Sequence, residues 1–425
     1  MILLFRERDH MPKFYATVAA FNAGTVKETQ SFEYDAFGRE VSTVWASFGE
    51  PLGVSPRSDV WTNQYDNQSR LVRVTSPTGI VFYEYDIVGR QTRVSSRGIG
   101  FQPVNSNDYE NDIRYSYDSL SRLATVETYE RNNVAVDVDA VTVGNQPQTA
   151  AYAYSLNGSL DYQTNPNGSV SDFTYDDLNR LTDIDEYKKD ANTPLVFTDN
   201  PKLAEYSYTL RADGKRDFVD EIIRKDDGTV FSHTTFDWNY DAAGRLTDEV
   251  FTDVGNLMAN ADDYRAVYTH DLTGSRVNKT VDIGNNGSID ESIVYTFDAN
   301  DRMQTESLDT GNNGSVDQTT TYGYTGTQQS AKTVNVGVSG SPLSAVNYGY
   351  DLQGRMSNVV STTYTNGTAG RVDTIGYRYG TDGIRISARQ DVTENGTTTT
   401  EITNYLIDAN NHTGYRQAFT PRRGI

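Results

Sequence analysis

The sequence predicts an all-β protein in which tandem β-hairpins pair edge to edge into one continuous, spiralling sheet, an open or partial hollow shell. Three observations predict it. A short aromatic–Asp motif recurs along nearly the whole chain, and a turn signal follows each copy. No stretch of helix length shows apolar residues at a 3.6-residue period. Because a lone hairpin is marginal in water, we expect the copies to pair with one another in a linear array.

The repeated motif is an aromatic residue followed by Asp, three further residues and Arg. Successive aromatic anchors lie between 20 residues (Tyr65 to Tyr85) and 37 residues (Tyr117 to Tyr154) apart. Complete copies begin at Tyr34, Tyr65, Tyr85, Tyr117, Tyr175, Tyr240, Phe297 and Tyr350, and degenerate copies at Tyr154, Tyr208, Tyr268, Tyr324 and Tyr379.

Most anchors have a second aromatic residue two positions earlier, as in Tyr83 with Tyr85 and Trp238 with Tyr240. A spacing of two places both rings on one face of a β-strand. Aromatic residues are also favoured in strands. The segment leading into each anchor is therefore predicted to be a strand with an aromatic face.

The residues after each anchor predict a tight turn. Asp241 suits the first position of a type I turn, where its carboxylate accepts a hydrogen bond from the backbone two residues on. Gly244 suits the left-handed residue that closes such a hairpin as a bulge. The positions equivalent to Gly244 hold Gly, Asn or Asp, which tolerate that conformation, except at Ser69 and Ser121.

We predict a structural role for the motif residues: Asp caps the turn, and Arg pairs with it or stacks on a neighbouring tyrosine. Recurrence in every unit favours architecture over catalysis. The residues concerned are Tyr34, Asp35, Gly38, Arg39, Tyr85, Asp86, Gly89, Arg90, Tyr117, Asp118, Arg122, Tyr175, Asp176, Arg180, Tyr240, Asp241, Gly244, Arg245, Tyr350, Asp351, Gly354 and Arg355.

A return strand follows each turn, typically beginning with an aliphatic residue such as Leu246 and then alternating. The chain thus divides into a non-repeat segment (1–24), the tandem repeats (25–404) and the end of the array (405–425). Two stretches, 132–148 and 188–194, interrupt the repeats and are predicted to be longer hairpin loops.

These repeats resemble the YD repeats of Rhs-type bacterial proteins, which also occur in wall-associated bacterial proteins and in teneurins. The Tyr-Asp-x-x-Gly-Arg core is intact at Tyr34, Tyr85, Tyr240 and Tyr350, and the resemblance runs from about residue 25 to 419. The stretch 405–415 also looks like one found late in such arrays.

The resemblance implies a β-strip that spirals into a hollow shell, secreted or at the cell surface, with other shell segments or an enclosed C-terminal toxin as partners. Toxin-bearing members carry a core with an Asp-Pro-x-Gly-Arg signature, where self-cleavage can occur. No Asp-Pro dipeptide occurs in this sequence. We therefore expect a partial member that lacks the core and the toxin, and self-cleavage is not carried over.

Composition excludes several classes of function. The net charge of −21 disfavours binding to nucleic acid or anionic lipid. With no cysteine, the chain has no disulfide and no cysteine-ligated metal. No run approaches the ~20 apolar residues that span a bilayer, and the apolar start is too short for a signal-peptide core.

Two nearly identical segments, 282–290 and 309–317, resemble the start of a calcium-binding loop. The candidate ligands are Asp282, Asn286 and Asp290 in the first and Asp309, Asn313 and Asp317 in the second. Position 3 is Gly and position 12 lacks the bidentate Glu, so the other interpretation is an Asn-Gly hairpin tip without metal. We expect no other cofactor.

The predicted function is a structural shell segment that encapsulates or presents an effector. The alternative is a cell-surface module that binds glycans or another cell. We expect no enzymatic activity, since neither a nucleophile elbow nor a phosphate-binding loop is present, and His233 and His270 stand without catalytic partners in sequence.

Overall fold

The protein is a single meandering β-sheet, described from a computed structural model. The structure describes residues 2–3, 13–15, 28–47, 57–98, 109–131, 134–135, 148–189, 197–255, 262–380, 383–408 and 417–424. In these residues the only helix is the short 3-10 helix η1 (Phe197–Asp199), and no helix has the length and apolar character to cross a membrane.

The strands of the first half include two, β1 and β2, that lie within the predicted non-repeat segment and continue the sheet. Their bounds are β1 (Ile2–Leu3), β2 (Lys13–Tyr15), β3 (Glu28–Tyr34), β4 (Glu40–Ser47), β5 (Arg57–Tyr65), β6 (Leu71–Ser76), β7 (Gly79–Tyr85), β8 (Gln91–Gly98), β9 (Asn111–Tyr117), β10 (Leu123–Arg131), β11 (Val134–Ala135), β12 (Gln148–Tyr154), β13 (Leu160–Thr164), β14 (Val170–Tyr175) and β15 (Leu181–Tyr187).

The strands of the second half lengthen towards the C-terminal end, where β28 and β30 have 12 residues each. Their bounds are β16 (Lys202–Leu210), β17 (Arg216–Arg224), β18 (Val230–Tyr240), β19 (Leu246–Asp253), β20 (Tyr264–His270), β21 (Arg276–Ile283), β22 (Glu291–Phe297), β23 (Met303–Thr310), β24 (Gln318–Thr325), β25 (Gln328–Val336), β26 (Pro342–Tyr350), β27 (Met356–Thr365), β28 (Thr368–Tyr379), β29 (Arg385–Glu394), β30 (Thr397–Asp408) and β31 (Gln417–Gly424).

Each strand pairs antiparallel with the next one along the chain, apart from β11, which pairs only with β10. In such a meander every second connection falls on the same long edge of the strip. All the motif turns therefore lie on one edge, here called the motif rim. The remaining connections form the second rim. Both predicted loop insertions fall there, between β10 and β12 and between β15 and β16, with most of their residues outside the described part.

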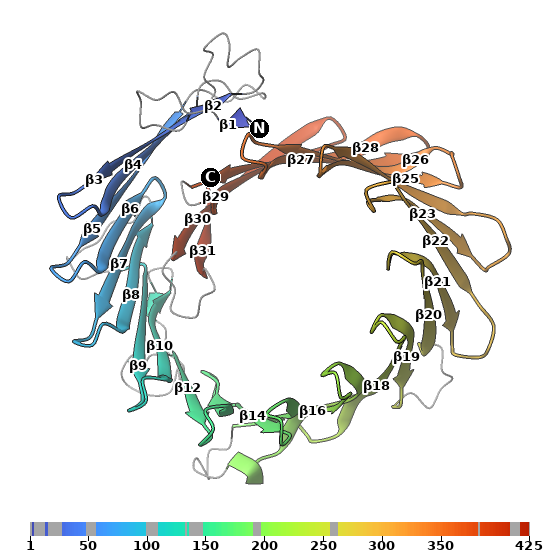
Figure 1. Cartoon of the computed structure of the whole chain (residues 1–425), viewed down its shortest axis with the longest axis horizontal. Coiled ribbons are helices and arrows are strands. Elements are labelled where there is room, and N and C mark those ends of the chain that lie inside the picture. The colour runs from blue at the N-terminus through green and yellow to red at the C-terminus, as the bar shows by residue number, and fades with distance from the viewer. Residues whose placement is uncertain are drawn as a thin grey trace.

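The strip curls through about a full turn, so that its last strands lie on the inner side of its first strands (Figure 1). The predicted continuous spiralling sheet is thus confirmed. The surface area is 24882 Å², whereas a compact monomer of this length would expose about 16,000 Å². The chain therefore forms a thin curved wall.

Pairing register fixes which side chains share a face of the wall. Trp45 lies opposite Asp59, and Asn63, further along the same strand, lies opposite Val74, which lies opposite Val81. Followed in the same way through to β28, the registers place every anchor aromatic and its predecessor on this face. Side chains on this face contact the last part of the strip. The last strands lie inside the first (Figure 1), so this is the inner face.

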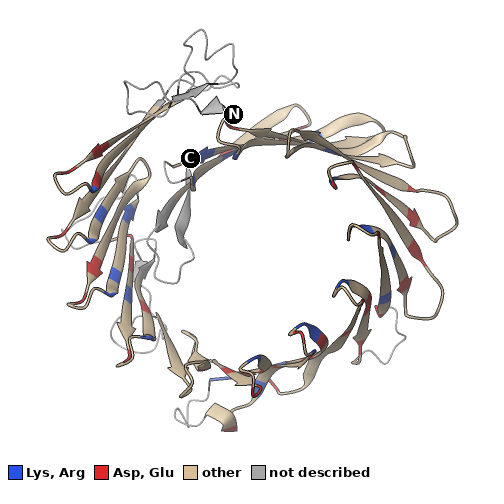
Figure 2. Ribbon diagram, in the orientation of Figure 1, with Lys and Arg blue, Asp and Glu red and all other residues tan. Residues whose placement is uncertain are grey.

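The inner face holds the apolar core and the outer face holds charged pairs across neighbouring strands. Both buried clusters, Val81 with Tyr83, Val94 and Tyr115, and Ala266 with Tyr268 and Val281, lie on the inner face. Outer-face pairs include Arg93 with Asp112, Arg224 with Glu205 and Arg265 with Asp248. Basic and acidic positions are interspersed along most of the strip (Figure 2). Aromatic residues thus favour one face.

Candidate functional site: the motif rim and the seam of the wall

The motif turns have the predicted geometry. In the first, the Gly38 N–H donates to the Asp35 carbonyl at 3.0 Å and the Asp35 N–H to the Arg39 carbonyl at 2.9 Å. The Asp35 carboxylate accepts from the Phe37 and Arg39 N–H groups. Gly38 has a φ of +77°, and the strand register shifts by one residue at Tyr34. This is a type I turn closed by a bulge.

The same left-handed conformation occurs at the equivalent position of the other complete copies, whether Gly, Asn, Asp or Ser. Ser69 and Ser121, the least suited residues, have φ values of +62° and +65°. Each serine hydroxyl also accepts a bond from the arginine of a preceding motif turn, Arg39 or Arg90. That contact gives the serine a partner that a glycine would lack.

The motif arginine joins its own turn to the next one. The Arg70 Nε donates to the Asp66 carboxylate at 2.7 Å, and Nη1 donates to the Asp86 carbonyl of the following turn at 2.8 Å. Its guanidinium carbon lies 4.9 Å from the centre of the Tyr85 ring, a cation–π distance. Arg180 and Arg245 make the same forward bond to a turn carbonyl.

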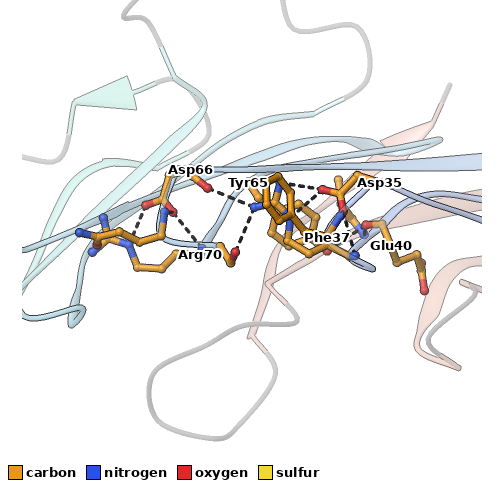
Figure 3. Close-up of polar contacts among 10 residues, drawn as sticks. Asp35, Phe37, Glu40, Tyr65, Asp66 and Arg70 are labelled. Carbon is orange, nitrogen blue, oxygen red and sulfur yellow. Dashed lines mark hydrogen bonds and ion pairs between the residues drawn. The ribbon is translucent and has the colours of Figure 1, made fainter.

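The anchor tyrosine joins its hairpin to the previous one. The Tyr65 hydroxyl donates to the Glu40 carbonyl at 2.9 Å, so its ring lies between the turns of Asp35 and Asp66 (Figure 3). The same bond recurs from Tyr85, Tyr117, Tyr154, Tyr175, Tyr240, Tyr324, Tyr350 and Tyr379 to the carbonyl at or beside the start of the preceding return strand.

These contacts shift the pKa of both residue types. The Arg70 backbone N–H, aided by the Arg70 guanidinium, holds the pKa of the Asp66 carboxyl below its usual range, and the equivalent groups do so at Asp118 and Asp176. Burial raises the pKa of the Tyr117 and Tyr154 hydroxyls. The folded motif rim therefore favours ionised aspartate and neutral tyrosine.

Elsewhere on the inner face, tyrosines bond to carboxylates. The Tyr322 hydroxyl donates to Glu306 at 3.0 Å, and burial together with this bond raises the pKa of Tyr322 to about 12. The Tyr264 hydroxyl donates to the Glu249 carboxylate at 2.7 Å, and the Trp238 Nε1 donates to the same carboxylate. Hydrogen bonds from aromatic side chains thus hold these two carboxylates on the inner face.

The two ends of the strip meet at a contact here called the seam, formed by Trp45, Asp59, Arg355 and Arg378. The Arg378 Nη2 lies 3.0 Å from both carboxylate oxygens of Asp59, 319 positions away in sequence. The Arg355 guanidinium carbon lies 4.7 Å from the centre of the Trp45 ring and 4.6 Å from that of Tyr379. Strand β30 also contacts β7. The seam closes the turn.

The two Asn-Gly loops lie side by side on the second rim. In the first, the Asp282 carboxylate accepts from the Asn286 and Gly287 N–H groups, and Asp290 accepts from the Ile283 N–H. The second loop repeats these bonds at Asp309, Asn313 and Asp317. Each loop is thus held by its own hydrogen bonds. Calcium binding stays a prediction.

No group of three or more His, Cys, Asp or Glu side chains gathers as a metal ligand set within the described residues. His233 contacts Asp220 at 2.8 Å on the outer face. Sequence reasoning found the motif turns but missed the tyrosine-to-carbonyl bond and the seam. Alternation along β4 and β5 would have placed Trp45 and Asp59 on the aromatic face, but nothing in the sequence gave their partner.

No family model and no curated protein matches the chain. Among solved structures it is similar to TcdB2-TccC3-TEV (11% identity over 97% of this chain and 23% of that one, TM-score 0.37). It is also similar to TcdB2-TccC3-Cdc42 (10% identity over 94% of this chain and 26% of that one, TM-score 0.33). A third similar structure is the Photorhabdus luminescens Tc holotoxin pore (12% identity over 89% of this chain and 25% of that one, TM-score 0.34). The chain spans about a quarter of these structures, and the scores are too low to establish a shared fold.

Proposed function

We propose that this chain is a structural wall segment of a hollow shell, in a secreted or cell-surface protein of the YD-repeat type, that encloses or presents an effector. The observation that carries the proposal is the seam: one sheet curls until Arg378 of β28 reaches Asp59 of β5. The motif arginines and most anchor tyrosines serve this architecture, because they link each hairpin to a neighbour.

The recurring bonds along the motif rim explain how a wall without a thick core holds together. Most anchor tyrosines and the motif arginines add contacts between adjacent hairpins, and net contributions of about 1 kcal/mol per hydrogen bond accumulate along the array. The stability of the wall is thus distributed over many equivalent hairpin contacts, which supports a role as a shell.

The alternative, recognition of glycans by exposed tyrosines, gains no support from the anchors. Most anchor hydroxyls donate to backbone carbonyls, and an arginine guanidinium lies 4.9 Å from the centre of the Tyr85 ring and 4.6 Å from that of Tyr117. A hydroxyl and a ring face that are engaged in this way are not available to a sugar.

Limited proteolysis tests enclosure. The last described strand, β31, lies on the inner side of the wall (Figure 1). A short protease-sensitive peptide fused after residue 425 should therefore be cut more slowly than the same peptide fused before residue 1. The free fusion peptide provides the intrinsic cleavage rate. Equal cleavage at both ends would contradict enclosure by the wall.

A further inference from the structure

The seam differs from every other strand contact in the described part of the wall. Neighbouring strands are joined by backbone hydrogen bonds, whereas among the described strands no backbone pairing joins the first ones to the last. The seam contacts that link the two ends are between side chains: the Asp59–Arg378 ion pair and the Arg355 guanidinium against Trp45. Separating this contact would break no backbone hydrogen bond of the sheet.

Three buried nitrogen atoms at the seam have no hydrogen-bond partner among the described residues: Trp45 Nε1, Arg355 Nη1 and Arg378 Nε. A buried donor left unpaired loses its hydration without compensation. At other motif arginines, such as Arg70 and Arg245, Nη1 donates to the next turn. At Arg355 that bond is missing while its guanidinium lies against Trp45.

The first strands nevertheless offer a shaped surface. Trp45 and Asp59 are only 4% and 8% exposed, and they face each other across β4 and β5. An indole ring and a carboxylate together fit a guanidinium by cation–π and ionic contact. The chain supplies two such groups, from the turn before β27 and from the end of β28.

We propose that the seam is a releasable closure: a docking surface on β4 and β5 for the chain's own β26–β28 segment, at which the wall opens without unfolding. The inference rests on the proposed shell function and adds the position at which the wall opens. Opening would hydrate the three unpaired nitrogens while every strand pairing stays intact. Salt favours opening, because it screens the Asp59–Arg378 pair, whose arginine is partly exposed.

Spin-label distance measurements on the full chain test this, since the absence of native cysteine lets two be introduced at will. One pair, Ser58→Cys with Gly376→Cys, spans the seam. A Cβ added at Gly376 has no atom within 4 Å, so the cysteine fits there. The control pair, Thr209→Cys with Thr269→Cys, lies within the paired sheet. Four strand spacings and a four-residue offset along the strand put the two positions about 23 Å apart. We expect salt to add a longer distance at the seam pair and to leave the control unchanged.

Charge reversal tests whether the Asp59–Arg378 ion pair itself holds the seam closed. Asp59→Arg should shift the seam distances to the longer population, and adding Arg378→Asp should restore the short one, because the swapped pair can re-form. A seam distance that ignores both salt and Asp59→Arg overturns the proposal. So does a failure of the double variant to restore it while the control pair stays intact. None of these outcomes depends on cargo, so they are separable from the proteolysis test of enclosure.

Discussion

At the scale of single residues, the anchor tyrosine links two hairpins by a hydrogen bond that the motif alone does not predict. The motif predicted the ring's face and the aspartate's turn, because both follow from spacing and backbone conformation. The hydroxyl's partner is a backbone carbonyl, such as that of Leu71 for Tyr85. Every residue carries such a carbonyl, so no sequence pattern could identify this acceptor.

Removing one such hydroxyl should have a measurable cost. Tyr117→Phe deletes the 2.6 Å bond to the Gln91 carbonyl and should lower the free energy of unfolding by about 1 kcal/mol. Urea denaturation followed by tyrosine fluorescence gives the value. Tyr34→Phe is the control, because Tyr34 is 59% exposed and should change stability little. Equal effects would argue against the hairpin-linking bond.

The pH dependence of stability follows from the pKa shifts. Asp66, Asp118 and Asp176 have lowered pKa values, so their stabilisation is complete above the usual aspartate value near 4 and is lost as pH falls through the folded pKa. Tyr117 and Tyr322 have raised values, so their stabilisation is complete below about 10 and is lost as pH rises through the folded pKa.

The urea midpoint should accordingly form a plateau between about pH 5 and 9 and fall on both sides. Urea titrations at unit pH intervals would show it. A midpoint that rises steadily from pH 8 to 11 would contradict the account, because it would require ionised tyrosine to be favoured by the fold.

At the scale of the element, the turn was the most predictable part of the molecule. A turn needs only local information, and the left-handed residue at its end is Gly, Asn or Asp in six of the eight complete copies. Which segments would lie on which rim was also implicit, since a meander of hairpins returns every second turn to the same edge. The lengths of the second-rim connections follow no repeat and required the structure.

The left-handed position can be tested apart from packing. Gly89 has a φ of +96° and free space where a Cβ would stand. Gly89→Ala should therefore destabilise the protein by about 1–2 kcal/mol through backbone strain alone. Gly376→Ala, with equal space but ordinary strand conformation, should be neutral or slightly stabilising. Thermal melting of both variants decides the matter, and similar losses would contradict the assignment of strain.

The Asn-Gly loops give a second test at this scale. The Asp282 and Asp309 carboxylates are already bonded to backbone N–H groups, so the loops need no ion to keep their shape. We expect the melting temperature to be the same in millimolar calcium and in chelator. A calcium-dependent rise that Asp290→Asn and Asp317→Asn abolish would instead establish the metal site.

At the scale of the whole molecule, the seam shows what the repeat could not predict. Trp45 and Asp59 are ordinary strand residues outside the motif, and Arg378 lies just before a degenerate copy. Their meeting depends on the curvature summed over more than twenty strands. A small change in twist per hairpin would displace the last strands from the first, and no local pattern encodes that sum.

The central claim, that one sheet curls into an open wall, is tested most directly by small-angle X-ray scattering of the monomer separated by size exclusion. A compact protein of 425 residues would have a radius of gyration of about 22 Å. The account predicts a clearly larger radius and a pair-distance distribution typical of a ring. A radius near the compact value, with a globular distribution, would contradict it.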